Sequence, residues 1–189
     1  MIKLADFVMD ARGARLERER QYHPGDADTF YETHGFSPDG RKIIFSASIG
    51  RQHPLDIDIW TIDLATGKAT PLTGTPGEWD EHAQYSPSGR TIVWMSSRGY
   101  PMKFPEKVST GRAWAKDLRT DYWLMNADGS NQTRLTYFNE PGYPESGGPT
   151  IASDVSWNKD GTKLVALVAA AGREAVGPRI VLIELSRPQ

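Results

Sequence analysis

The sequence predicts an all-β protein built from repeated units of four antiparallel strands. The main observation is a threefold repeat, in which an aromatic residue is followed by a tight turn and an apolar strand. The copies start at Phe36, Tyr85 and Trp157. The second observation is the composition, because 18 glycines and 13 prolines separate short apolar runs along the 189 residues. Short strands joined by tight turns account for this pattern better than helices do.

The first strand of each predicted unit ends at the aromatic residue, and a turn leads from it into the second strand. In the first copy the turn is Ser-Pro-Asp-Gly. Pro38 presets φ for this turn, and Gly40 supplies the positive φ that lets the chain reverse. Gly89 and Gly161 stand at the same place in the other two copies. We therefore interpret Gly40, Gly89 and Gly161 as structural turn residues.

The third and fourth strands follow as a second hairpin. Residues 58–63 alternate apolar and polar side chains, as a half-buried strand does, and residues 121–126 match them in the next copy. Turns at residues 65–68 and 127–130 lead into the strands 69–73 and 132–136. The Asp128-Gly129 pair between two such runs is a strong hairpin signal. Each complete unit is thus predicted to be a four-stranded antiparallel meander.

These units divide one predicted domain over residues 1–189. Residues 1–30 are interpreted as the third and fourth strands of a split unit, residues 31–80 and 81–150 as complete units, and residues 151–189 as an incomplete last unit. The second complete unit carries an insertion at residues 98–119. Its aromatic residues Tyr100, Phe104 and Trp114 predict either an anchor for a partner or a loop that folds back on its own unit.

Residues 36–45, 58–63 and 122–136 resemble the WD40-like repeats of TolB-type β-propellers. The resemblance implies blades of four strands around a central channel, commonly six or seven of them. About three blades are present in this sequence, which is half a propeller. An open arc exposes the apolar faces of its end blades, so we expect a homodimer that completes a six-bladed ring.

Polar residues on the predicted first strands are candidates for a metal site. When the repeats are aligned on their aromatic residues, His82 and Asp154 fall at one level of the channel, and Glu32 and Glu81 at the level beside it. Imidazole and carboxylate groups suit divalent Mn, Zn or Fe. Residues 80–86 also resemble the repeats of oligogalacturonate lyases, which implies a channel metal held largely by histidines. The candidate ligands are Glu32, His34, Glu81, His82 and Asp154. A water-filled channel lined by polar strands is the alternative.

The remaining composition signals exclude several classes of function. A formal net charge of −2 gives no argument for nucleic acid, and no apolar run has the length of a membrane-spanning helix. We therefore expect neither a nucleic-acid partner nor membrane insertion. The absence of cysteine excludes disulfides and thiolate metal sites. The N-terminus lacks the basic stretch and apolar core of a signal peptide, whereas the TolB-type resemblance implies a family that is often periplasmic.

No complete catalytic set is present in the sequence. A Gly-x-Ser-x-Gly elbow is missing, and the glycine-rich residues 145–149 lack the Lys-Ser/Thr pair of a phosphate-binding loop. We therefore expect a non-enzymatic scaffold that binds a protein or glycan through its loops and channel mouth. Two alternatives stay open. One is a metal-dependent polysaccharide lyase of the oligogalacturonate type, or a hydrolase, that uses the channel His and Glu residues. The other is a fragment of a longer TolB-like protein.

Overall fold

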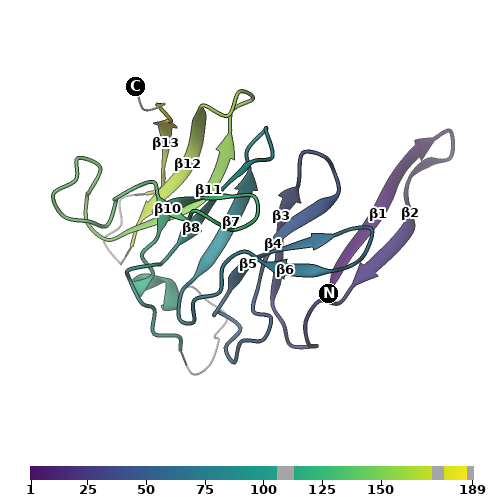
Figure 1. The fold of residues 1–189 in the computed structure, drawn as a ribbon, viewed down its shortest axis with the longest axis horizontal. Helices are drawn as coiled ribbons and strands as arrows, with labels where there is room; N and C mark the ends of the chain where they lie inside the picture. The colour runs from purple at the N-terminus through teal and green to yellow at the C-terminus, as the bar shows by residue number, and fades with distance from the viewer. Residues whose placement is uncertain (106–112, 172–176, 187–189) are drawn as a thin grey trace.

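The computed structural model describes residues 1–105, 113–171 and 177–186. Within them the fold is all-β, and successive antiparallel sheets lie side by side in chain order (Figure 1). The predicted four-stranded propeller blades are thereby confirmed. No helix of the described residues is long and apolar enough to cross a membrane.

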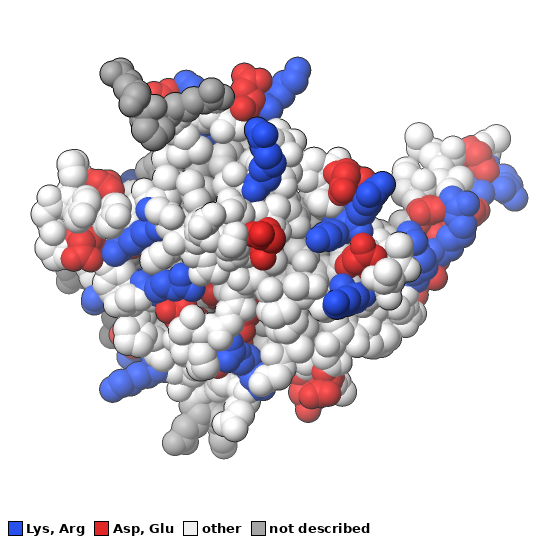
Figure 2. Space-filling model, in the orientation of Figure 1, with Lys and Arg blue, Asp and Glu red and all other residues white. Residues whose placement is uncertain are grey.

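The chain opens with a hairpin of two strands, β1 (Ile2–Asp10) and β2 (Gly13–Tyr22). It projects from one end of the molecule, and acidic and basic side chains are interspersed along it (Figure 2). Cross-strand ion pairs such as Lys3 with Glu19 join its two strands. The hairpin contacts the rest of the protein at its root, where Ile2 is buried and the Tyr22 hydroxyl donates a 2.9 Å hydrogen bond to the Leu64 carbonyl oxygen.

Two complete blades follow the hairpin. The first has the order β3 (Tyr31–Phe36), β4 (Lys42–Ala47), β5 (Asp58–Asp63) and β6 (Ala69–Pro71). The second has the order β7 (Asp80–Tyr85), β8 (Thr91–Ser96), β9 (Asp121–Asn126) and β10 (Thr133–Arg134). A short 3₁₀ helix, η1 (Ala113–Asp117), lies in the insertion between β8 and β9. The last sheet contains β11 (Thr150–Trp157), β12 (Lys163–Ala170) and β13 (Arg179–Glu184).

Three apolar clusters lie between successive sheets. The first joins the hairpin to the first blade through Ile2 and Phe45, and the second joins the two complete blades through Ile44 and Trp94. The third joins the second blade to the last sheet and includes Tyr122. Neighbouring residues of one strand point to opposite faces, so Ile44 and Phe45 contribute to different clusters. Each complete blade is therefore held from both sides.

The turns of successive blades contact one another through their glycines and prolines. Gly40, Gly89 and Gly161 have φ values of 69°, 70° and 68°, a left-handed conformation that side chains with a Cβ rarely adopt. A Cβ at Gly89 would lie 3.5 Å from the ring of Pro38, and one at Gly161 would lie 3.5 Å from Pro87. Each later turn thus packs against the proline of the turn in the preceding blade.

Candidate metal centre

The first strand of each sheet carries a β-bulge at a matching level. The pairing register shifts between residues 33 and 35 in β3, between 81 and 84 in β7, and between 152 and 155 in β11. A bulge leaves an extra residue outside the hydrogen-bonded ladder and redirects its side chain. His34, His82 and Asp154 occupy these three bulges. Because β7 contacts both β3 and β11, the three redirected side chains lie in one region.

Three side chains of β3 and β7 have ligand atoms close enough to one another to bind one metal ion. One atom each from Glu32, His34 and His82 lies within 4.8 Å of the other two. The imidazole rings of His34 and His82 have their centroids 5.7 Å apart. All three side chains are half-buried, and they come from the adjacent strands β3 and β7. We call Glu32, His34 and His82 the channel triad.

His82 links the triad to the last sheet. Its φ of 51° is left-handed, which is uncommon for a residue other than glycine. The Nδ1 atom lies 3.3 Å from the Asp154 carboxylate, and Nε2 lies 3.4 Å from the Glu81 carboxylate. Nε2 is also 3.4 Å from the Ser153 hydroxyl. The bulge therefore places this imidazole between β7 and β11.

Glu81 is a buried carboxyl group beside the triad. Burial first, and then the hydrogen bond with Glu32, raise the pKa of Glu81 to about 8. The Trp79 indole N–H donates a 2.9 Å hydrogen bond to Oε2 of Glu81. Glu81 is therefore protonated at neutral pH.

His34 is held in its neutral form. Burial lowers the pKa of His34 to about 3, and the neighbouring His82 lowers it as well. Its Nε2 atom lies 2.6 Å from the Ser46 hydroxyl, which can hold the ring in one orientation. A neutral imidazole is the form that binds a metal ion, and a hydrogen bond that orients the ring is the usual support for such a ligand.

The structure brings all five sequence candidates together. Glu32, His34 and His82 form the triad, and Glu81 and Asp154 contact His82. Ser46, which the sequence reasoning did not select, is the cross-strand partner of Glu32. The register of the predicted β3–β4 hairpin is the signal that points to it, because residues directly opposite each other in a sheet interact.

Two aromatic residues of the insertion, Tyr100 and Phe104, contact their own protein. The Tyr100 hydroxyl lies 3.2 Å from the Glu140 carboxylate and 2.9 Å from the Arg134 guanidinium. The Phe104 ring stacks on His53 with a centroid separation of 5.0 Å and packs against the apolar cluster of the last sheet. The Trp114 side chain lies outside the described residues. These contacts hold Tyr100 and Phe104 against the body of the protein, and partner binding by the three aromatic residues stays a prediction.

No model of a known protein family matches the chain. Solved structures with a similar fold include a putative TolB from Agrobacterium tumefaciens, with 22% identity, a TM-score of 0.59, and coverage of 95% of this chain and 52% of that chain. An oligogalacturonate lyase in complex with manganese matches at 17% identity and a TM-score of 0.50, covering 98% of this chain and 45% of the lyase. A prolyl endopeptidase matches at 14% identity and a TM-score of 0.54, covering 90% of this chain and 24% of the peptidase. These likenesses show a TolB-like propeller fold, and the chain spans about half the length of the TolB and lyase structures.

Proposed function

We propose that this chain is a propeller scaffold whose first strands hold one divalent cation. The observation that carries the proposal is the channel triad, in which Glu32, His34 and His82 offer three ligand atoms within 4.8 Å of one another. Three protein ligands leave coordination positions for water or for a bound molecule. Such an ion would give the scaffold a fixed positive charge for the capture of an acidic partner.

The ligand chemistry favours a borderline transition metal. Two imidazoles and a carboxylate suit Zn, Mn or Fe, whereas Mg and Ca prefer oxygen ligands alone. His34 is neutral at physiological pH because its pKa lies at about 3, so it loses no proton when it binds the ion. The carboxyl group with the raised pKa of about 8 is Glu81, which is not a member of the channel triad.

The comparison structures support the scaffold and are compatible with the metal. Propellers of this fold include proteins of unrelated activity, since TolB, a lyase and a peptidase share it. The lyase is a complex with manganese. At 17% identity this likeness concerns the fold. The proposal for this chain depends on its own triad.

Metal binding can be tested by calorimetric titration with Mn²⁺ or Zn²⁺, using protein purified without an affinity tag. His82→Asn is the sharpest variant, because asparagine tolerates left-handed backbone and lacks the imidazole. We expect one ion per chain and a loss of affinity of at least about tenfold in this variant. His23→Asn is the matched control, since His23 lies outside the triad. Equal affinity in both variants, or no binding at all, would contradict the proposal.

A second candidate is an enzyme, a metal-dependent polysaccharide lyase of the oligogalacturonate type or a hydrolase. The observation in its favour is Glu81, which is protonated at neutral pH because its pKa is about 8. A buried acid next to a cation can donate a proton to a leaving sugar oxygen. The assay is the formation of unsaturated or shortened products from polygalacturonate with Mn²⁺ present. Products that disappear with Glu81→Gln favour the enzyme, and metal binding without products favours the scaffold.

The binding partner of the scaffold belongs to the same proposal. A protein or glycan would meet the channel mouth and the insertion, where Tyr100 and Phe104 are partly buried. An acidic glycan fits best, because its carboxylates can complete the coordination of the proposed ion. Titration of oligogalacturonate in the presence and absence of Mn²⁺ tests this step. Binding that is independent of the metal would show that the partner uses another surface.

A further inference from the structure

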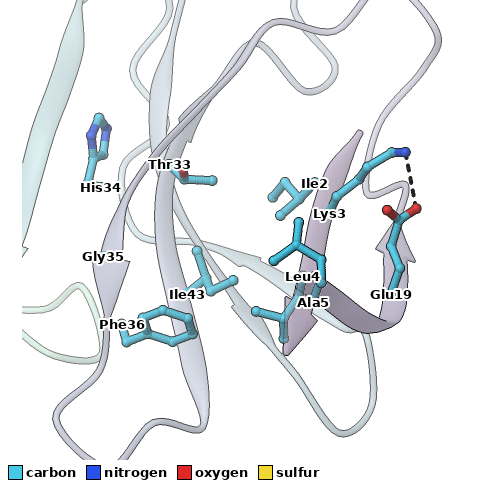
Figure 3. Close-up of a pocket in the computed structure, with 11 residues that line it drawn as sticks. Ile2, Lys3, Leu4, Ala5, Glu19, Thr33, His34, Gly35, Phe36 and Ile43 are labelled. Carbon is cyan, nitrogen blue, oxygen red and sulfur yellow. Dashed lines mark ion pairs between the residues drawn. The ribbon is translucent and has the colours of Figure 1, made fainter. Parts of the chain in front are cut away.

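Two apolar surfaces that no other described residue covers lie at opposite ends of the arc. The first is an open cavity of about 570 Å³ between the hairpin β1–β2 and the strands β3 and β4. Figure 3 shows Ile2, Leu4 and Ala5 on one wall and Phe36 and Ile43 on the other. We call this cavity the hairpin groove.

The groove widens towards the tip of the hairpin, because the hairpin separates from the first blade in that direction. Its root is packed, since Ile2 and Tyr22 contact the cluster around Phe45. Towards the tip the hairpin diverges from β3 and β4 (Figure 1). Phe7 and Leu16 are direct cross-strand partners on this diverging part, and both are exposed. A neighbouring blade is what normally fills the space beside a blade, and here the hairpin fills only its outer part.

The second surface is the outer face of the last sheet. Val165, Ile180 and Leu182 alternate with inward-facing residues on β12 and β13, and all three are exposed. Among the described residues β13 is hydrogen-bonded to β12 alone, so its other edge is open. An exposed apolar strand with an open edge is a site of association. We call Val165, Ile180 and Leu182 the outer sheet face.

We propose that the hairpin groove receives the outer sheet face of a second copy of this chain, and that the contact is made twice around a twofold axis. Each copy then covers the other's groove and outer sheet face at once, which is the closed arrangement of an isologous dimer. The strands β11 to β13 of one copy would occupy the inner position that the other copy's hairpin leaves open.

The exposed apolar area is sufficient for a stable dimer. Seven large side chains of the hairpin, the groove wall and the outer sheet face are between 47% and 76% exposed: Phe7, Met9, Leu16, Phe36, Val165, Ile180 and Leu182. Together they offer on the order of 800 Å² per copy, taking about 150–200 Å² for each side chain when fully exposed. Two copies would then bury roughly 1,600 Å², which is the size of a standard specific interface.

The two ion pairs beside these surfaces do not oppose the pairing. Lys3 pairs with Glu19 beside the groove, and Lys163 pairs with Glu184 beside the outer sheet face. Neither surface therefore presents a single-sign field that would repel an identical copy. Figure 2 likewise shows both signs interspersed over the visible face of the protein.

The test is the solution mass of the full chain, measured by light scattering over a range of concentrations. We expect a discrete species near twice 21.0 kDa. Leu182→Glu and Phe36→Glu each place a charge in one of the two surfaces, and each should give a monomer. Tyr143→Glu is the matched control, because Tyr143 is an exposed aromatic residue outside both surfaces, and this variant should remain a dimer. Circular dichroism confirms that each variant is folded.

Crosslinking identifies the surfaces independently of these charge variants. The chain has no cysteine, so single cysteines can be introduced at Leu16 and at Ile180 in separate proteins. Oxidation of a mixture should join Leu16→Cys to Ile180→Cys, and neither protein alone should crosslink to the same extent. A monodisperse monomer, an open-ended series of larger species, or a dimer that survives both glutamate variants would each overturn the proposal.

Discussion

Replacing Asp80 by asparagine should stabilise the protein increasingly as the pH rises from 4 to 7. Asp80 is fully buried at the start of β7, where its Oδ1 atom accepts a 3.2 Å hydrogen bond from the Trp94 indole. Burial raises the pKa of Asp80 from 3.8 to about 6, and the hydroxyls of Ser96 and Thr73 offset only part of this effect. The folded state thus prefers the protonated acid.

The sign and size of the effect follow from this shift. A carboxyl group whose pKa is raised in the folded state does not reduce the unfolding free energy below its unfolded pKa. The loss of unfolding free energy grows between the unfolded and the folded pKa, and it is complete above the folded pKa. For Asp80 the window runs from 3.8 to about 6. A shift of this size corresponds to about 3 kcal/mol of unfolding free energy. Asparagine keeps the acceptor for Trp94 and has no charge to bury, so Asp80→Asn should remove this loss.

Urea unfolding of both proteins at pH 4, 5, 6 and 7 measures the difference. The neighbouring Glu81 titrates at a higher pH, with its pKa at about 8, and does so in both proteins. Asp39→Asn is the control of opposite sign, because hydrogen bonds from Ser37 and the backbone N–H of Arg41 lower the pKa of this exposed carboxyl group. A difference between wild type and Asp80→Asn that stays constant over this pH range would refute the reasoning.

Three further predictions concern the turns, the core and the metal centre. Gly40→Val should destabilise the protein by roughly 1–3 kcal/mol, because φ is 69° at Gly40. The control Gly74→Ala should lower the unfolding free energy less in the same urea titration, because Gly74 has no positive φ and no neighbour within 4 Å of an added Cβ. Tyr122→Phe should lower the unfolding free energy by about 1–3 kcal/mol, because the Tyr122 hydroxyl bridges β9 to the backbone of β11 and β12. In the control Tyr143→Phe, the thermal unfolding temperature should be unchanged. Glu32→Gln should weaken the calorimetric affinity for Mn²⁺ by about tenfold or more, because it removes the carboxylate ligand of the channel triad; an unchanged affinity would argue against Glu32 as a ligand.

The blades were predictable because their signals are local. A Pro-Asp-Gly turn after Phe36 and an Asp-Gly turn at residues 128–129 define hairpins within a few residues of sequence. Repetition then aligns the blades, which was enough to bring Glu32, His34 and His82 into one candidate set. The offsets from the aromatic residue differ, because Glu32 lies four residues before Phe36, His34 two before Phe36 and His82 three before Tyr85. The alignment therefore predicts neighbouring levels, and the bulges in β3 and β7 bring the two imidazole rings together.

The details of the site could not be predicted from the sequence, because they depend on contacts between strands. The left-handed backbone of His82 results from a bulge in the β7–β8 pairing, and no glycine or asparagine marks it. Phe104 stacks on His53 from 51 residues away, a contact that local patterns do not encode. The burial that shifts the pKa of Glu81 likewise comes from the packing of neighbouring sheets.

The stacking of turn glycines on prolines restricts how this protein can change in evolution or by design. The turn of each later blade rests on the turn before it, through Gly89 on Pro38 and Gly161 on Pro87. An insertion in one turn would displace the contact that seats the next blade, whereas duplication of a whole blade would bring a proline and a glycine together and preserve the spacing. The repeat should therefore tolerate the duplication of a whole blade and should not tolerate the insertion of a single residue in a turn. Arrays with more or fewer blades are accessible to this sequence by copying units, and the length of the turn is the part that must stay fixed.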